Sequence, residues 1–119
     1  MPGVESVTDG VYRRVIRAEG THRGGWLEVC HLPAKNALQL RFAASLAPAT
    51  QAVLSRTKQV FDVAADPQEI SAALGALSDG APGLRLPGAF DGFELALRAI
   101  LGQQVTVKAA RTLATRFVE

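Results

Sequence analysis

Residues 82–104 hold the feature that most constrains the fold, a glycine- and proline-rich loop that leads into a strongly marked helix. Two Pro-Gly dipeptides break the chain before residue 89, and Asp91 then stands where a helix N-cap is expected. Glu94, three residues later, completes the pattern of a capping box. The following apolar residues recur at helical spacing and predict one buried face: Phe93, Leu97, Ile100 and Leu101.

The predicted helix ends at a bend that presents polar side chains. We expect Gly102 to end it in the left-handed conformation, which glycine adopts at little cost. Gln103 and Gln104 then lie at the bend, and Thr106 is placed to cap a second helix. This pattern indicates two long amide side chains exposed on a short loop between two buried helices.

The first half of the chain alternates as β-strands do. Residues 11–18, 26–32 and 38–42 are rich in β-formers, with Leu27 and Val29 alternating against polar neighbours. Short turns separate these runs and leave no room for crossover helices, so we expect an antiparallel sheet. One face of that sheet should be buried and the other exposed to water.

Helices are predicted to follow the sheet. Ser45 is a candidate cap for a helix over residues 46–62, and Asp66 with Pro67 marks the start of another. Ile70, Ala73, Leu74 and Leu77 recur at helical spacing and predict that this second helix is short, and a last helix runs from residue 107 to the end of the chain. The sum is an α+β domain of antiparallel sheet plus helices, followed by the opening of a helical domain.

Composition restricts the cellular setting more than the activity. The chain has 119 residues, a net charge of +2 and a single cysteine, so an internal disulfide is excluded. No apolar run approaches the roughly 20 residues needed to cross a bilayer, and no signal-peptide pattern begins the chain. We therefore expect a cytoplasmic protein with no membrane association.

Three long segments carry a family resemblance. They read SVTDGVYRRVIR, KQVFDVAADPQEI and GLRLPGAFDGFELALRAILGQQV, and the similarity extends from about Gly3 to Val118. The chain resembles DNA-3-methyladenine glycosylase II, the AlkA-type alkylation-repair glycosylases, some of which are fused behind an Ada-type adaptive-response regulator. The resemblance implies a TATA-binding-protein-like α+β domain over residues 1–80. Residues 81–119 would be the first helices of a truncated helix-hairpin-helix glycosylase core.

The same resemblance implies a function in base-excision repair. Such an enzyme flips an alkylated purine, for example 3-methyladenine, out of double-stranded DNA and removes it hydrolytically. In the family, the catalytic aspartate and the DNA-gripping hairpin lie downstream of the segments matched here. We therefore expect no catalytic residue in this chain, no activity of the fragment by itself, and no cofactor. A last helix that ends at Glu119 without a stop signal also suggests a truncated fragment.

The resemblance assigns the bend a role in DNA binding. Gln103, Gln104, Val105 and Thr106 match the loop that enters the duplex where the base leaves, with Gln104 at the intercalating position. An apolar Leu can occupy this position in the family, so the glutamine is a departure that exchanges stacking for hydrogen bonding. Lys108 and Arg111, on the next helix, are candidates for contacts with the DNA backbone. From spacing alone, all of these residues fit an ordinary solvated surface equally well.

Other candidate groups have simpler interpretations. Asp91 and Glu94 fit a capping box better than a catalytic carboxylate pair, and His22, His31 and Cys30 lack the spacing of metal ligands, so no metal site is predicted. A cluster of arginines in the first predicted strand suggests either a basic patch or an exposed sheet face: Arg13, Arg14 and Arg17.

Two further functions remain open from the sequence. The chain is alternatively a non-catalytic α+β module that binds DNA through its sheet, as part of an adaptive-response regulator fusion. It is alternatively a structural domain that self-associates into a homo-oligomer through exposed helix faces. These alternatives differ from the glycosylase hypothesis in whether the bend contacts DNA.

Overall fold

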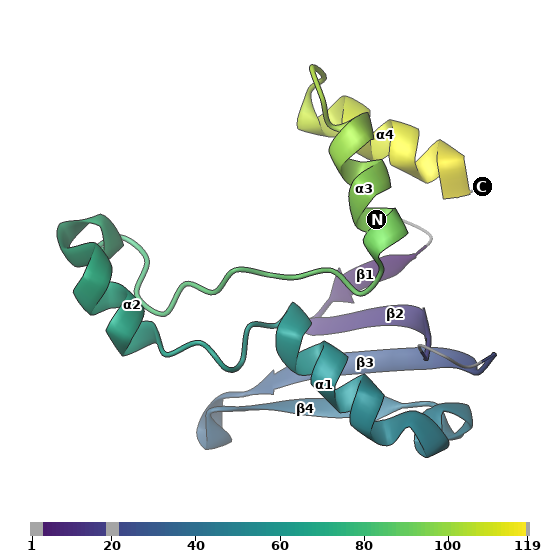
Figure 1. The fold of residues 1–119 in the computed structure, drawn as a ribbon, viewed down its shortest axis with the longest axis horizontal. Coiled ribbons are helices and arrows are strands. Elements are labelled where there is room, and N and C mark those ends of the chain that lie inside the picture. The colour runs from purple at the N-terminus through teal and green to yellow at the C-terminus, as the bar shows by residue number, and fades with distance from the viewer. Residues whose placement is uncertain (1–3, 19–21, 119) are drawn as a thin grey trace. The chain divides into compact units, whose positions relative to one another are not determined.

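The computed structural model describes residues 4–18 and 22–118, and it contains an antiparallel sheet followed by helices (Figure 1). The sheet has four strands in the order β1-β2-β3-β4, so each strand pairs with its neighbour in sequence. This arrangement confirms the expected α+β class. In chain order the elements are β1 (Glu5–Thr8), β2 (Val11–Arg17), β3 (Gly24–Leu32), the 3-10 helix η1 (Pro33–Lys35), β4 (Ala37–Phe42), the 3-10 helix η2 (Ala44–Ala49), α1 (Thr50–Val60), α2 (Pro67–Leu74), the 3-10 helix η3 (Gly75–Ser78), α3 (Gly92–Leu101) and α4 (Val107–Val118).

Strand β1 is an addition to the three strands expected from the sequence. It pairs antiparallel with β2, with Glu5 opposite Arg14. The turn between them is Asp9-Gly10, and both residues have positive φ, 53° and 71°. Asp-Gly with two left-handed residues is typical of the tight two-residue hairpin turn, whose twist suits antiparallel strands. That dipeptide was the available sequence signal for the fourth strand.

The two faces of the sheet differ as the alternation predicts. Leu27 and Val29 of β3 are buried on one face, at 0% and 2% exposure. On the other face Val15 lies opposite Trp26 in the register, and both side chains remain exposed. Arg14 belongs to the buried face, because it lies opposite Leu27.

The passage from β4 to α1 differs from the expected single helix. A 3-10 helix, η2, precedes α1, and its N-cap is Ala43 without a side-chain hydrogen bond. Ser45 therefore does not cap a helix: its Oγ donates to the carbonyl oxygen of Gly24, 2.8 Å away. Leu46 is fully buried in η2. The serine thus joins η2 to the start of β3.

The structure divides into two compact units, Met1–Thr50 with Asp91–Glu119, and Gln51–Phe90. In the second unit, the proline-rich loop after η3 returns to the end of α1. The N–H of Gly88 donates to the carbonyl of Val60 at 2.9 Å, and the N–H of Leu86 donates to Asp62 Oδ2 at 3.1 Å. The domain boundary that the sequence predicts, between residues 80 and 81, does not correspond to the limits of these compact units, and it stays a prediction.

Helix α2 begins as predicted. Asp66 is its N-cap and accepts the N–H of Gln68 at 2.8 Å, with Pro67 in the first turn. The helical spacing of Ile70 and Leu74 is confirmed, although Ile70, Leu74 and Leu77 are all exposed. Helical spacing predicts which residues share a face but does not supply a partner for that face. Among the described residues, no helix combines the length and the hydropathy that a membrane span requires.

We predict that Gly25→Ala lowers the free energy of unfolding by about 1–3 kcal/mol, as overpacking does in tight interiors. A Cβ at this position would lie 2.7 Å from the Cβ of Ala43 and 2.8 Å from the Oγ of Ser45. Urea denaturation measures the change. The control is Gly80→Ala, where the added Cβ meets nothing within 4 Å. Equal stability of the two variants would contradict the close approach of β3 and η2.

Candidate nucleic-acid interface

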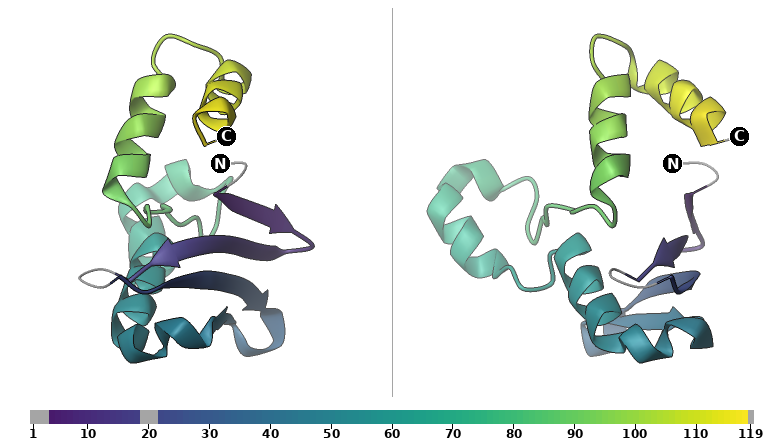
Figure 2. Two further views of the ribbon diagram at one scale, coloured as in Figure 1. Left: turned by 90° about the vertical axis from the view of Figure 1, so that its right-hand side faces the viewer. Right: turned by 45° about the vertical axis from the view of Figure 1, so that its right-hand side comes forward.

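Helices α3 and α4 are joined by a corner, defined here as residues 102–106. Figure 2 shows this corner at the end of α3 that lies farther from the sheet. Gly102 is the C-cap, and its N–H donates to the carbonyl of Arg98 at 2.9 Å. Its φ of −85° is right-handed, so the expected left-handed glycine is wrong. The left-handed residue is instead Gln104, with φ 58°.

The corner exposes the side chains that the family resemblance singles out. Gln103, Gln104, Val105 and Thr106 are all exposed, and Val105 retains 43% of its accessible surface. Thr106 caps α4 as expected, because its Oγ1 accepts the N–H of Ala109 at 3.2 Å. A non-glycine residue in the left-handed region is uncommon and has to be supported by its surroundings. The geometry therefore places Gln104 at the apex of a defined turn, accessible from outside.

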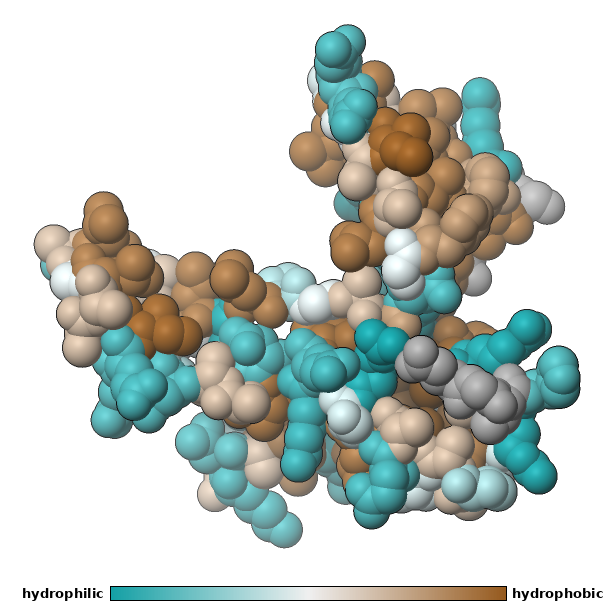
Figure 3. Space-filling model, viewed as in Figure 1, coloured by the Kyte–Doolittle hydropathy of each residue, from teal (hydrophilic) through white to brown (hydrophobic). Residues whose placement is uncertain are grey.

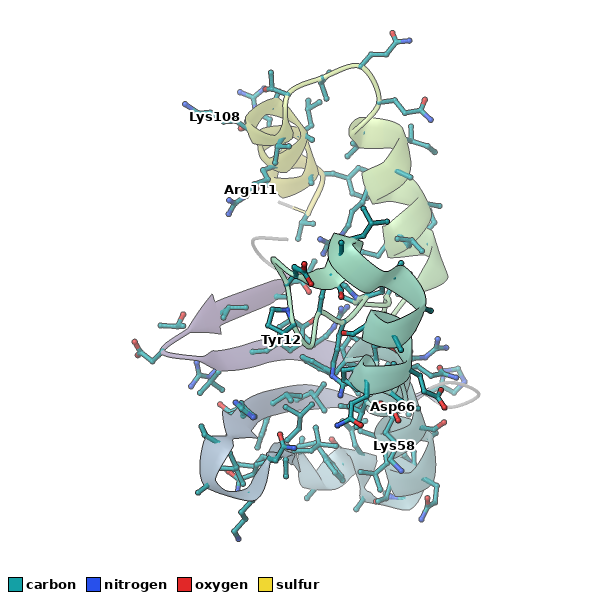
Figure 4. All side chains as sticks on the ribbon, turned by 90° about the vertical axis from the view of Figure 1, so that its left-hand side faces the viewer. Tyr12, Lys58, Asp66, Lys108 and Arg111 are labelled. Atoms are coloured by element: carbon teal, nitrogen blue, oxygen red, sulfur yellow. The ribbon has the colours of Figure 1, made fainter. Side chains whose placement is uncertain are left out.

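Lys108 and Arg111 lie on one exposed side of α4. Figure 4 shows both side chains extending from α4 on the side away from α3. They border a shallow depression of about 420 Å³, together with Val107, Thr112 and Thr115. The two threonine hydroxyls donate to carbonyls of their own helix. Two cations and the first turn of a helix suit a phosphate chemically.

At the other end of α3, only Asp91 fulfils the role that a capping box would give it. Asp91 is the N-cap, as predicted, and its Oδ1 accepts the N–H of Glu94 at 2.8 Å. The side chain of Glu94 does not complete a capping box. Its carboxylate binds Arg14 of β2 and Arg98 of α3 instead. A guanidinium with little access to water attracts a carboxylate more strongly than an exposed backbone N–H does.

Four charged residues form a closed cluster, called here the ionic ring: Glu5, Arg14, Glu94 and Arg98. Arg14 Nη2 lies 2.8 Å from Glu94 Oε2, and Arg14 Nη1 lies 3.8 Å from Glu5 Oε2. Arg98 Nη2 donates to carboxylate oxygens of both glutamates. Each residue of the ring thus contacts two residues of opposite charge. The side chains of Arg14 and Glu94 are only 6% and 13% exposed.

The ring shows that Arg14 belongs neither to a basic patch nor to an exposed sheet face, the two interpretations that the sequence left open for the arginines of β2. Arg14 is buried and paired, whereas Arg13 points to the other face, where its Nε lies 2.8 Å from Glu28 Oε1. Arg17 is exposed. Period-two alternation was the signal that could have separated them, because Arg14 has the same parity as Tyr12 and Ile16 on the inward-facing side of the strand.

Tyr12 extends the ring with a hydrogen bond. Its hydroxyl donates to Glu5 Oε2 at 2.6 Å and accepts from Arg14 Nη1 at 3.3 Å. Burial and the bond to Glu5 raise the pKa of Tyr12 to about 12. Burial also favours the neutral form of Glu5. Hydrogen bonds to its carboxylate, including those from Tyr12 and Arg98, outweigh burial and lower the pKa of Glu5 from 4.5 to about 2.

Apolar surface surrounds the ring and the corner. A cavity of about 740 Å³ lies among β1, α3 and α4, and Val7, Leu101 and Ala114 are part of its lining. The expected apolar faces of the two helices are largely uncovered, with Phe93 70% and Val107 80% exposed. Figure 3 shows this hydrophobic surface over α3 and α4. Only Ala114 of these two helices is buried.

The remaining candidates do not assemble into a site in the described part of the chain. No group of three or more His, Cys, Asp and Glu residues there is arranged to hold a metal ion. The thiol of Cys30 is half-buried on β3 and donates to Gln39 Oε1 at 3.5 Å. His22 and His31 are both exposed.

We predict that Glu5→Gln makes stability less sensitive to acid. Because folding lowers the pKa of Glu5, its charged form stabilises the fold above about pH 4.5, and this contribution is lost as the pH falls toward about 2. Glutamine keeps the shape but does not titrate. Urea denaturation between about pH 5 and about pH 2 should therefore show a smaller loss of unfolding free energy for Glu5→Gln. Tyr12→Phe removes one hydrogen bond to the carboxylate and so brings the folded pKa of Glu5 closer to its ordinary value; this variant should also lose less unfolding free energy over this range than the unaltered protein. Superimposable profiles for all three proteins would contradict this role of the carboxylate.

Comparison with known proteins agrees with the resemblance seen in the sequence. The family model described as the AlkA N-terminal domain matches residues 1–91. The chain is 39% identical over 116 residues to DNA-3-methyladenine glycosylase 2 of Escherichia coli strain K12, a match that covers 98% of this chain and 40% of that protein. It is also 39% identical over 126 residues to the probable bifunctional transcriptional activator/DNA repair enzyme AlkA of Mycobacterium tuberculosis, covering 99% of this chain and 24% of that protein. The chain thus spans less than half of each relative. It belongs to the AlkA N-terminal domain family.

Proposed function

We propose that this chain is the N-terminal part of a base-excision DNA glycosylase that flips and hydrolytically removes alkylated purines such as 3-methyladenine. The observation that carries the proposal is the 39% identity, over 98% of the chain, to a protein named DNA-3-methyladenine glycosylase 2. The exposed corner supports it, because a buried corner would be unable to reach a duplex. In this proposal, residues 1–80 form the α+β domain and residues 81–119 begin the helical core of a cytoplasmic enzyme.

The corner would act where the flipped base leaves the duplex. Extrusion of a base leaves a gap in the stack, and a side chain that enters the gap opposes the return of the base. Gln104 is the middle residue of the corner, it has a left-handed backbone conformation, and its side chain is exposed. Its amide both donates and accepts hydrogen bonds and can pair with the orphaned base opposite. Gln103 would contact the duplex beside it.

The start of α4 would hold the DNA backbone in register. The amino end of a helix attracts a phosphate, and Thr106 and Val105 lie directly before it. Lys108 and Arg111 add positive charge on one exposed side of the same helix. Contacts of this kind position a protein on DNA without reading its sequence.

Hydrolysis would need groups beyond those in this chain. Removal of a base requires a carboxylate that activates water or stabilises the positive charge that develops on the sugar. The carboxylates near the corner have other roles: Asp91 caps α3, and Glu5 and Glu94 bind arginines. In this proposal the catalytic aspartate lies downstream of these residues, as the family resemblance implies. We therefore propose that the corner and the start of α4 position DNA and that none of their residues catalyses hydrolysis of the bond between base and sugar.

Base release tests the proposal. The full-length protein should release 3-methyladenine from alkylated duplex DNA, and the 119-residue chain should release none. Chromatography of the free base measures both. Release by the chain alone would refute the assignment of the catalytic carboxylate to a later segment, and no release by the full-length protein would refute the glycosylase function.

Replacement of the apical glutamine tests the corner. In the full-length protein, Gln104→Ala should lower kcat/KM for base release about tenfold, since the loss of one hydrogen-bonding side chain forfeits about 1–1.5 kcal/mol. The matched control is Gln51→Ala, an exposed glutamine on α1, which should leave kcat/KM unchanged. Equal activity of the two variants would remove Gln104 from the proposed interface.

Two other functions predict different outcomes. The mycobacterial relatives are named as transcriptional activators as well as DNA repair enzymes, and this name is the reason to test a regulatory DNA-binding module. Binding through the sheet would be lost with Arg13→Ala plus Arg17→Ala and retained with Gln104→Ala, although Arg13 is already paired with Glu28. Self-association through the exposed faces of α3 and α4 would appear in light scattering as a concentration-dependent mass.

A further inference from the structure

The ionic ring joins the sheet to the helix that carries the corner. Glu5 and Arg14 belong to β1 and β2, and Glu94 and Arg98 belong to α3. We propose that the ring is a positioning device, which sets the direction of α3 and thereby the place at which Gln104 meets DNA. This inference rests on the proposed function of the corner.

Apolar packing does little to orient α3 in the described structure. The helix has no buried residue, and several of its large apolar side chains are exposed, Phe93 and Ile100 among them. Val7 of β1 and Leu101 of α3 are apolar side chains from the sheet and from the helix, and both line the 740 Å³ cavity. Hydrogen-bonded ion pairs, made by Glu94 and Arg98 of α3 with Arg14 and Glu5 of the sheet, connect the two elements.

Ionic contacts specify direction better than apolar contacts do. Glu94 and Arg98 lie one turn apart on the same stripe of the helix, so both face the sheet in one rotational setting only. A rotation of α3 by one residue, about 100°, would take both side chains away from Arg14 and Glu5. Arg14 would then keep a charge with little access to water and without its 2.8 Å partner, which is costly.

The position of the corner is sensitive to the tilt of α3. A helix of this length extends roughly 15 Å, so a tilt of about 10° at its start moves its end by about 2.5 Å. Binding constellations tolerate displacements of only about 0.5 Å. The ring lies at the start and middle of α3, and the carbonyl of Arg98 accepts the N–H of Gly102, the first residue of the corner. One turn of α3, closed by this hydrogen bond, thus separates Arg98 of the ring from the corner.

A pair of substitutions separates positioning from stability. Arg14→Met with Glu94→Leu replaces one ion pair by apolar contacts, an exchange that is often neutral or stabilising. The matched control is Arg13→Met with Glu28→Leu, which removes the 2.8 Å ion pair on the opposite face of the sheet. Glu94→Gln is the second variant and removes one charge while keeping the shape. Thermal unfolding of the full-length protein confirms that each variant is folded.

The first measurement needs no DNA. Spin labels at Arg17→Cys and Gln103→Cys, with Cys30 and any other cysteine replaced by serine, report the distance from sheet to corner by pulsed paramagnetic resonance. The Arg14→Met/Glu94→Leu variant should broaden the distance distribution about twofold or more, well beyond the tolerance of a binding site. The control should keep the original width. An unchanged width in the folded variant would overturn the proposal.

The second measurement connects the ring to the duplex. The probe is a duplex with one abasic-site analogue beside a 2-aminopurine, whose fluorescence rises when the base unstacks. At saturating protein, Glu94→Gln and the apolar pair should each lower this signal about threefold, because the corner is misplaced. The dissociation constant should change less than about twofold, because phosphate contacts supply most of the affinity.

The outcomes distinguish the two proposals. If the unaltered protein gives no unstacking signal, the proposed function of the corner fails. If the unaltered protein gives the signal and both ring variants retain it in full, the positioning role alone fails. A loss of signal in the Arg13→Met/Glu28→Leu control equal to that in the ring variants would also overturn the positioning role, since the effect would then not be specific to α3.

Discussion

The contact that joins the two ends of the first compact unit is the ion pair between Arg14 and Glu94, two residues separated by 80 positions in sequence. It joins a strand near the beginning of the chain to a helix near the end. Burial of a guanidinium is costly unless charge and hydrogen bonds compensate for it. Glu94, Glu5 and Tyr12 supply that compensation. The register of β1 against β2 brings Glu5 beside Arg14, so the short first strand is part of this arrangement.

The α3–α4 corner combines defined geometry with exposed side chains. Gln104 adopts a backbone conformation that few non-glycine residues favour, and it is held between the C-cap of α3 and the threonine cap of α4. Its surroundings are apolar and largely uncovered, which suits surfaces that meet another molecule or another part of the same protein. The proposed DNA contact requires that the amides of Gln103 and Gln104 be exposed, and they are exposed beside the uncovered apolar faces of α3 and α4.

Prediction from sequence succeeded for features that depend on neighbours along the chain. The caps at Asp66, Asp91 and Thr106 all formed, because each needs only a side-chain oxygen and a backbone N–H two or three residues away. The alternation of Leu27 and Val29 likewise predicted the buried face of the sheet. Four of the five corner residues could be singled out from the family resemblance, and the structure shows all four exposed: Gln103, Gln104, Val105 and Thr106.

Local pattern alone determined strands β2 to β4, helices α2 to α4 with their N-terminal caps, and the bend between α3 and α4. Tertiary structure decided what those patterns leave open. The carboxylate of Glu94 binds Arg14 rather than the backbone N–H at the start of α3, because a buried guanidinium from another element is the stronger partner. The left-handed residue of the corner became Gln104 rather than Gly102, since the chain turned two residues later than expected. Spacing along a chain sets which side chains share a face, whereas the elements that fold against that face decide whether it is buried, paired or exposed.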